Sequence, residues 1–368
     1  MSGRTFPLWS AAAMLVAGCA ADQPAMTAPS AAPAFSRAGG VAVVSVMTQN
    51  LYPGANLDAV IAALVSPDPD DDLPALGFAL NTLIETDFPT RAAAIADRIA
   101  RERPHAVALQ EVFAFDIDIN FGTPVRILLP FLDVLQAELD ARGLEYVVAA
   151  QNLNFTLTPF PGITLSDLDV LLVDESRVTV ENAANGTFTA NLPPLGPLQI
   201  RRGWVYAEVR IEDRPYVLVG AHPESGHTPG LPELRAAQIG ELLGLVPAAG
   251  PVLLMGDLND FPDSPMYQLI VAAGFTDVWA ALRPGADGST CCHADDLSDP
   301  VARFDQRIDY IFARGFGAPP VGVQGSIRLF GAVPADRFPG PVHPLWPSDH
   351  AALLGRMLLP AAVLAGDT

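Results

Sequence analysis

PVLLMGDLNDFPDSP, residues 251–265, is the stretch that decides the fold of this chain. Its first five residues are apolar, and a glycine then leads into Asp257, Asn259 and Asp260. A short buried strand that ends abruptly in acids and an amide is typical of an α/β protein with a polar site at its strand ends. A plain turn is the alternative interpretation, because Gly-Asp and Asn-Asp also form turns that bond their own backbone.

Other apolar runs end in the same way, which favours the site over the turn. VAVVSVMTQN ends at Asn50, HAVALQEVF carries Glu111, and PYVLVGAHPES ends in His222 and Glu224. Each run is short, rich in β-branched residues and polar at its carboxyl end, as expected for core strands. Taken alone, each polar residue also has a purely structural interpretation, such as a turn residue for Asn50 or a solvated carboxylate for Glu111.

Two later segments reverse this order. In QRIDYIFARG, Asp309 precedes the apolar residues, and in PSDHAALLGRMLL, Asp349 and His350 precede them. Antiparallel neighbours bring the carboxyl end of one strand beside the amino end of the next. A mixed sheet therefore predicts that all these polar groups share one rim.

The residue types on this rim suit hydrolysis assisted by a hard metal ion. Carboxylate and amide oxygens are ligands for Mg²⁺ or Mn²⁺, and nearby histidines bind phosphate oxygens or move protons. Zinc is disfavoured, because the sequence has neither HExxH nor paired CxxC motifs. It also lacks the G-x-S-x-G, P-loop and G-x-G-x-x-G motifs. The sequence therefore gives no support for a serine hydrolase, a nucleotide-dependent switch or a dinucleotide-binding Rossmann protein.

Taken together, these motifs resemble those of the endonuclease/exonuclease/phosphatase (DNase I-like) superfamily, in the same order and from about Val41 to Leu359. The motifs are MTQNLY with Asn50, LQEV with Glu111, GAHPE with His222, GDLND with Asp257 and Asn259, RIDYIF with Asp309, and SDHAAL with Asp349 and His350. One departure is Ala221-His222-Pro223, where the family usually has Thr-His-Leu. The resemblance implies a four-layer, two-sheet α/β sandwich with mixed sheets and helices on the outer faces.

The resemblance also implies the metal ligands. Glu111 would be the principal ligand of Mg²⁺ or Mn²⁺, helped by Asn50 and Asp349. The implied reaction is in-line attack of water on a phosphoester, without a covalent enzyme intermediate.

The catalytic roles follow from the same resemblance. Asp257 would orient or deprotonate the attacking water, and Asn259 would hold a phosphate oxygen or the nucleophile. Asp309 would orient His350, and His222 would bind phosphate or protonate the leaving oxygen. Whether His350 or Asp257 is the base stays open, and Asp260 is expected to be structural.

Two further polar clusters lie beside predicted strands. Arg201 and Arg202 precede a predicted strand, where they suit either a phosphate clamp or a solvated strand start, and Arg202 is the candidate substrate-binding residue. In DLDVLLVDES, Asp167 and Asp169 are expected to cap the start of a core strand rather than to bind metal.

The amino terminus predicts export. Arg4 precedes an apolar stretch, and LVAGC at residues 15–19 resembles the lipobox of bacterial lipoproteins, which predicts lipidation of Cys19. A plain secretory signal ending near Ala20-Ala21 is the alternative. The expected organisation is a signal peptide at 1–18, a lipid-anchored tether at 19–40, a catalytic domain at 41–360 and a tail at 361–368. The enzyme would then be anchored to a bacterial membrane, on the periplasmic or cell-surface side, by its lipid alone.

The charge bears on the substrate. All 21 basic residues are arginine and the net charge is −20. A DNA-coating protein is usually basic, so a small or lipid-borne phosphodiester is favoured over nucleic acid. Nuclease, lipid phosphodiesterase and phosphatase remain open, and we expect a monomer. A catalytically silent surface binding protein is the alternative from another class.

Helical spacing and local composition give the remaining expectations. A helix is expected over Thr90–Arg103, capped by Thr90, and another over Pro232–Leu245, while Pro67–Pro74 reads as an acidic loop. Cys291 and Cys292 are adjacent, and a disulfide between them, separate thiols or a bond to another chain all remain open. The segment Thr290–Arg303 is expected to be a loop on the rim of the site.

Overall fold

The computed structural model describes residues 42–66, 68, 70–120, 124–194, 199–317 and 322–359. The predicted signal peptide, the tether with Cys19 and the carboxyl-terminal tail lie outside the described residues. No helix within the described part of the chain is both long and apolar enough to cross a membrane.

The first sheet has seven strands in the order β12-β15-β1-β2-β5-β4, with β3 paired to β2. β1 and β2 run parallel, and the other neighbours are antiparallel. Its strands are β1 (Ala42–Asn50), β2 (Ala106–Asn120), β3 (Pro124–Pro130), β4 (Tyr146–Phe160), β5 (Ile163–Asp174), β12 (Gln324–Phe330) and β15 (Ala352–Leu359).

The second sheet has six strands in the order β10-β11-β9-β8-β7-β6. Only β8 and β9 run parallel within it. Its strands are β6 (Val178–Thr187), β7 (Gly203–Ile211), β8 (Arg214–His222), β9 (Val252–Asp257), β10 (Thr276–Asp277) and β11 (Asp309–Arg314). A small separate ribbon pairs β13 (Phe338–Pro339) with β14 (Pro344–Leu345).

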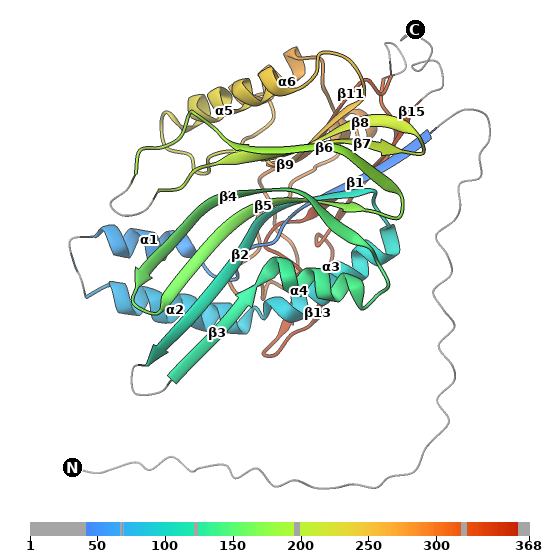
Figure 1. The fold of residues 1–368 in the computed structure, drawn as a ribbon. Coiled ribbons are helices and arrows are strands. Elements are labelled where there is room, and N and C mark those ends of the chain that lie inside the picture. The colour runs from blue at the N-terminus through green and yellow to red at the C-terminus, as the bar shows by residue number, and fades with distance from the viewer. Residues whose placement is uncertain are drawn as a thin grey trace, which may run out of the picture. The chain divides into compact units, whose positions relative to one another are not determined.

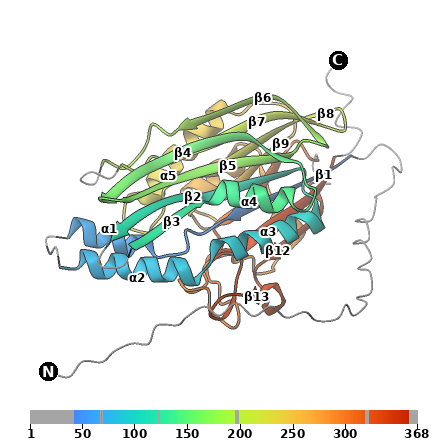
Figure 2. The ribbon, with the colours of Figure 1, turned by 60° about the horizontal axis from the view of Figure 1, so that its bottom comes forward.

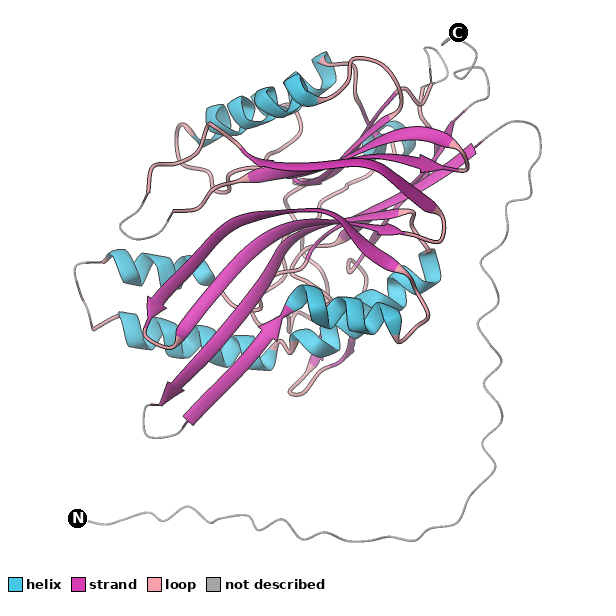
Figure 3. Cartoon of the chain, in the orientation of Figure 1, coloured by secondary structure: helices cyan, strands magenta, loops and turns pink. Residues whose placement is uncertain are grey.

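Helices cover the outer face of each sheet (Figures 1 and 3). Four pack on the first sheet, as the turned view also shows (Figure 2): α1 (Leu57–Val65), α2 (Asp72–Glu85), α3 (Phe88–Glu102) and α4 (Phe131–Asp140). Two pack on the second sheet, α5 (Leu231–Leu245) and α6 (Pro265–Ala272). The short α7 (Val278–Leu282) lies against β11 and β12. The four-layer sandwich with mixed sheets is confirmed.

The core between the sheets explains why so many strands read as unbroken apolar runs. Val46 and Leu171 of the first sheet share one buried cluster with Leu218 and Met255 of the second. All six residues of β9 are buried, because inter-sheet packing covers one face and α5 and α6 cover the other. Burial of apolar side chains on both faces of these strands stabilises the sandwich through the hydrophobic effect. Polar groups are therefore left at the strand ends.

The two predicted helices are confirmed, with corrected starts. The first begins at Phe88 rather than Thr90, and the expected cap is wrong: the Thr90 hydroxyl donates to Asp87 Oδ2 at 2.5 Å from inside the helix. The second begins at Leu231, one residue early. In both, a proline stands in the first turn, where its missing N–H has no intrahelical acceptor to lose.

The expected acidic loop is wrong over part of its length. Pro67 lies outside the described residues, and α2 already begins at Asp72, so that Pro74 sits in its first turn. Acids at this position suit the amino end of a helix, where the backbone N–H groups are unpaired.

Candidate active site

Strand ends from both sheets converge on one rim. Asp257 is the last residue of β9 and Asp309 the first of β11, and the antiparallel register sets them opposite each other. His222 ends β8, which is parallel to β9. Asn50 ends β1, beside Gln110 of β2. The sheet topology thus brings together residues that lie far apart in sequence.

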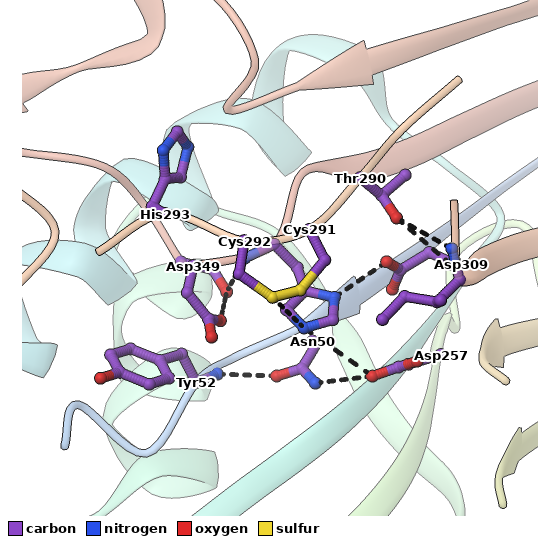
Figure 4. Close-up of a disulfide and its surroundings, with 12 residues drawn as sticks. Asn50, Tyr52, Asp257, Thr290, Cys291, Cys292, His293, Asp309 and Asp349 are labelled. Carbon is purple, nitrogen blue, oxygen red and sulfur yellow. Dashed lines mark hydrogen bonds and ion pairs between the residues drawn. A yellow bond between two sulfur atoms is a disulfide. The ribbon is translucent and has the colours of Figure 1, made fainter. Parts of the chain in front are cut away.

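Asp257 contacts residues from several of these strand ends, and its bond to Asn50 is drawn in Figure 4. Its Oδ2 accepts a hydrogen bond from Asn50 Nδ2 at 3.2 Å, and its Oδ1 accepts from the backbone N–H of Asn259 at 3.0 Å. The same Oδ2 lies 3.8 Å from His222 Nε2 and 3.9 Å from His350 Nε2. One carboxylate therefore borders both histidines.

His350 is held by an acid from the neighbouring strand. Its Nδ1 lies 2.8 Å from Asp309 Oδ2, which leaves Nε2 facing Asp257. Although burial alone would lower the pKa of His350, the nearby Asp309, Asp349 and Asp257 raise it well above its usual value. Asp309 thus fixes the ring and favours its protonated form.

His222 has the opposite electrostatic setting. Burial, followed by the charge of Arg202, lowers its pKa to about 4. Arg202 Nη1 lies 3.2 Å from His222 Nδ1, and Asp169 Oδ1 lies 3.3 Å from the same nitrogen. The two histidines of the rim therefore differ in charge, one neutral and one cationic near neutral pH.

The expectation for Asp167 and Asp169 is wrong. Both lie inside β5, only 1% exposed, and not at its start. Alternation along a strand puts residues two apart on the same face, and Asn154 Nδ2 of β4 donates to both carboxylates, at 3.0 and 3.1 Å. Burial raises the pKa of Asp169 to about 7. The D-L-D spacing was the available signal that both acids lie on one face of the strand, on which Asp169 lies against His222.

Arg202 is buried, so a solvated strand start is wrong for it, whereas Arg201 is exposed. Its Nε lies 3.4 Å from Glu224 Oε1, and its Nη2 donates to Ser225 Oγ at 3.2 Å. Arg202 therefore spans from His222 to the segment that follows β8, and it balances part of the negative charge of the rim.

Asn259 is hydrogen-bonded to Ala221-His222-Pro223, the segment that departs from the usual family motif. Its Nδ2 donates to the Pro223 carbonyl at 3.2 Å, and its backbone has a positive φ of 55°. Asp260 instead points away, into a buried ion pair with Arg235 at 3.1 Å, as its expected structural role requires.

Glu111 and Asp349 complete the acidic side of the rim. The pairing of β2 with β5 shifts register between Leu109 and Val112, and Glu111 in this bulge has a φ of 55°. Burial and the neighbouring Asp349 raise the pKa of Glu111. Burial likewise raises the pKa of Asp349. Bulges beside active sites commonly re-aim one side chain, and here the side chain is a carboxylate.

Comparison with known proteins identifies the family. A family model described as Endonuclease/Exonuclease/phosphatase family matches residues 80–350. The chain belongs to this family. No curated protein matches it in sequence.

Solved structures of the family share the fold at low identity. A family protein from Bacteroides thetaiotaomicron is 14% identical, with a TM-score of 0.54 over 87% of this chain and 96% of its own. One from Beutenbergia cavernae is 20% identical, with a TM-score of 0.55 over 86% and 72% of the two chains. D. rerio TDP2, solved with a single-strand DNA product, is 17% identical, with a TM-score of 0.50 over 86% and 98%.

The rim fits the divalent metal that is general in this family. Ligand atoms of Glu111, His222 and Asp257 all lie within 4.8 Å of one another. Among the described residues, the buried Oδ1 atoms of Asp169 and Asp309 have no hydrogen-bond partner, although Asp169 Oδ1 lies 3.3 Å from His222 Nδ1. Several buried carboxylates with so few partners repel one another unless a cation is shared. Oxygen-rich donors of this kind suit Mg²⁺ or Mn²⁺.

Arg91 is an additional residue that sequence reasoning missed. It is fully buried in α3, and its guanidinium donates to the carbonyls of Leu51, Tyr52 and Pro347 at 2.6, 3.0 and 3.3 Å. These carbonyls lie just after Asn50 and just before Asp349. Arg91 thus ties two rim segments to one helix, and an arginine in an amphipathic helix gives no local sign of this contact.

Cys291 and Cys292 form a disulfide with each other. Figure 4 draws the pair together with Asn50, Asp257, Asp309 and Asp349, and Cys292 Sγ lies 3.9 Å from His350 Nε2. His293, the next residue, is buried; its ring stacks on Trp346 and its Nε2 bonds the Gly331 carbonyl at 2.9 Å. His293 is therefore structural.

Proposed function

We propose that this protein is a Mg²⁺- or Mn²⁺-dependent phosphodiesterase. The observation that carries the proposal is the position of Asp257, whose carboxylate borders Asn50, His222 and His350 at once. A carboxylate, a neutral histidine and a cationic histidine around one point supply the groups that phosphoester hydrolysis needs.

The metal would be held by Glu111, with Asn50 and Asp349 as further ligands. When bound, it would supply positive charge that polarises the phosphoryl group and offsets the charge developing in the transition state. The same carboxylates would lose their mutual repulsion, which supports metal binding on grounds independent of the reaction.

The protein's own groups divide the work between them. Asp257 orients the attacking water and accepts its proton, because its Oδ2 lies 3.8 and 3.9 Å from the Nε2 atoms of His222 and His350. His350, cationic through Asp309, binds a phosphate oxygen with its Nε2–H. His222 binds phosphate or serves the leaving oxygen, and Asn259 positions the group beside Asp257. Arg202 supports His222 and balances charge, because its own donors are already shared with Glu224 and Ser225.

Within this class we favour a lipid-borne or small phosphodiester over nucleic acid. The net charge of −20 opposes a polyanion. A cavity lined only by apolar side chains lies between α1, α2 and the strands β2, β4 and β5. Its lining includes Ala55, on the loop that follows Asn50, and such a surface suits an alkyl chain.

The decisive experiment is a substrate panel with purified full-length protein in Mg²⁺ or Mn²⁺. It would include bis-p-nitrophenyl phosphate, sphingomyelin, supercoiled DNA, RNA and inositol phosphates. Asp257→Ala and His350→Ala should each abolish turnover, and EDTA should stop it. Absence of turnover on every substrate would favour the catalytically silent binding protein, and full activity in both variants would refute the assigned site.

Anchoring at Cys19 is a separate proposal, supported by the LVAGC motif alone. Cys19→Ala should release the protein from the membrane fraction of an expressing bacterium. Retention of the variant on membranes would contradict a lipid anchor.

A further inference from the structure

The Cys291–Cys292 pair touches the catalytic histidine. Cys292 Sγ lies 3.9 Å from His350 Nε2, the nitrogen that faces Asp257. The ligand atoms of Cys291, Cys292 and His350 all lie within 4.8 Å of one another. Cys291 is buried and Cys292 is exposed, so solvent reaches the pair from one side.

The backbone fixes this contact from two directions. Cys291 bridges to Gln306, three residues before Asp309, and the Ala351 N–H, next to His350, donates to the Thr290 carbonyl at 2.8 Å. His293 N–H donates to the Asp349 carbonyl at 2.9 Å. The cysteines and His350 are therefore held together whatever the oxidation state of the sulfurs.

The donor set differs in kind from that of the Mg²⁺ site. Two thiolates and an imidazole select thiophilic ions such as Zn²⁺ or Cd²⁺, whereas Mg²⁺ prefers oxygen ligands. At zinc bond lengths of about 2.3 Å to sulfur and 2.0 Å to nitrogen, tetrahedral geometry separates S and N by about 3.5 Å. The separation of 3.9 Å between Cys292 Sγ and His350 Nε2 is close to this value.

We propose that the reduced Cys291–Cys292 pair, with His350 Nε2, forms an inhibitory site for a thiophilic divalent cation. A dithiol reductant transfers two electrons and two protons to the disulfide, which gives two thiols and the oxidised reductant. The cation then displaces the two thiol protons and the Nε2 proton of His350, which pass to solvent, so that His350 no longer donates to phosphate. The disulfide form has no thiolates and leaves His350 free. Cation binding itself does not depend on the proposed function, whereas inhibition rests on it.

Binding is tested with Cd²⁺, because thiolate ligands give an ultraviolet charge-transfer band that oxygen ligands do not. The full chain would be reduced, freed of reductant without oxygen, and titrated beside the disulfide form and Cys292→Ser. The reduced chain should show the band at one Cd²⁺ per chain and should bind Zn²⁺ at least ~10-fold more tightly than the other two. Equal Zn²⁺ affinity in all three, or absence of the band in the reduced chain, would overturn the proposal.

His350→Ala and His343→Ala separate the histidine contribution by calorimetry. His350→Ala should weaken Zn²⁺ binding to the reduced chain, while His343→Ala, a half-exposed histidine away from the rim, should not. Equal affinity in the two variants would remove His350 from the site. Zn²⁺ inhibition of the reduced enzyme, absent in the disulfide form, is the matching activity readout.

Discussion

At the scale of single residues, Asp169 is the residue whose position differs most from the one expected from the sequence. It places a carboxylate 3.3 Å from His222 Nδ1, opposite the nitrogen that faces Asp257. An acid in this position orients the ring, as carboxylates commonly do for catalytic histidines. Sequence reasoning put it at a strand start, because the length of β5 could not be read from its apolar half alone.

Asp169→Asn should therefore lower kcat/KM on bis-p-nitrophenyl phosphate by about 10- to 100-fold. Its melting temperature should be unchanged or higher, since an amide costs less to bury than a charge. Asp167→Asn is the matched control, because it shares the Asn154 contact but has no His222 contact. If Asp167→Asn slows the enzyme as much, the orienting role of Asp169 is wrong.

His105 links a single buried residue to stability. The Ser45 N–H donates to its Nδ1 at 3.0 Å, and burial, followed by Arg177, lowers its pKa from 6.5 to about 3. Between these values the unfolded chain binds more protons than the folded one. The stability contributed by the neutral ring is present above about pH 6.5 and is lost as the pH falls.

His105→Asn keeps an acceptor for Ser45 but cannot titrate. Between pH 7 and pH 4 the wild type should lose on the order of 2 kcal/mol more unfolding free energy than this variant. Denaturant unfolding at several pH values measures the difference, with His343→Asn as the control. Parallel pH profiles for wild type and His105→Asn would show that His105 does not titrate in this window.

At the scale of elements, strand ends were predictable and strand contacts were not. The runs ending at Asn50, His222 and Asp257 are local patterns of apolar residues, and β1, β8 and β9 end where those patterns do. The pairing of Asp257 with Asp309 depends on β9 and β11 meeting across some 50 intervening residues. Such pairing is set by tertiary packing, and the reversed order of polar and apolar residues around Asp309 predicted a shared rim without identifying the partner strand.

The helices divide in the same way. The helices expected over Thr90–Arg103 and Pro232–Leu245 from their apolar spacing form over residues 88–102 and 231–245. The helices α1 and α2 were not, because LDAVIAALV is apolar on nearly every side and acids precede α2. Their apolar surface is explained only by the cavity they line against β2, β4 and β5.

Gly256 shows how closely β8 and β9 must approach to place the rim. Its φ is +151°, and a Cβ there would lie within 1.9 Å of the Ala221 carbonyl oxygen. Gly256→Ala should push β9 from β8, separate Asp257 from His222, cost about 3 kcal/mol of unfolding free energy and remove most activity. Thermal unfolding and kcat/KM measure the two effects.

Gly240→Ala provides the contrast for the same substitution. Gly240 lies in α5 with nothing within 4 Å of its added Cβ. It should gain about 0.5–1 kcal/mol from reduced backbone entropy and keep full activity. If Gly256→Ala behaves like Gly240→Ala, the close approach of β8 and β9 does not position the site.

At the scale of the whole molecule, the negative net charge distinguishes this chain from a nuclease that binds DNA through basic residues. The net charge is −20, and Arg202, the one arginine in the described part of the chain that contacts a rim histidine, is shared with Glu224. A polyanion approaching the rim is therefore repelled over a distance of about 10 Å at 0.1 M salt. A small monoanionic diester meets far less of this field.

Added salt should then raise kcat/KM on DNA, whereas it lowers the affinity of a basic nuclease for DNA. At fixed Mg²⁺, raising NaCl from about 0.02 to 0.15 M should increase kcat/KM on DNA severalfold, because the Debye length shortens. The value for bis-p-nitrophenyl phosphate should change little over the same range. A protein that neutralises DNA phosphates instead loses affinity steeply as salt rises, through counterion release. A steep fall in kcat/KM on DNA as salt rises would therefore reveal a local basic surface. Nucleic acid would then become the favoured substrate class.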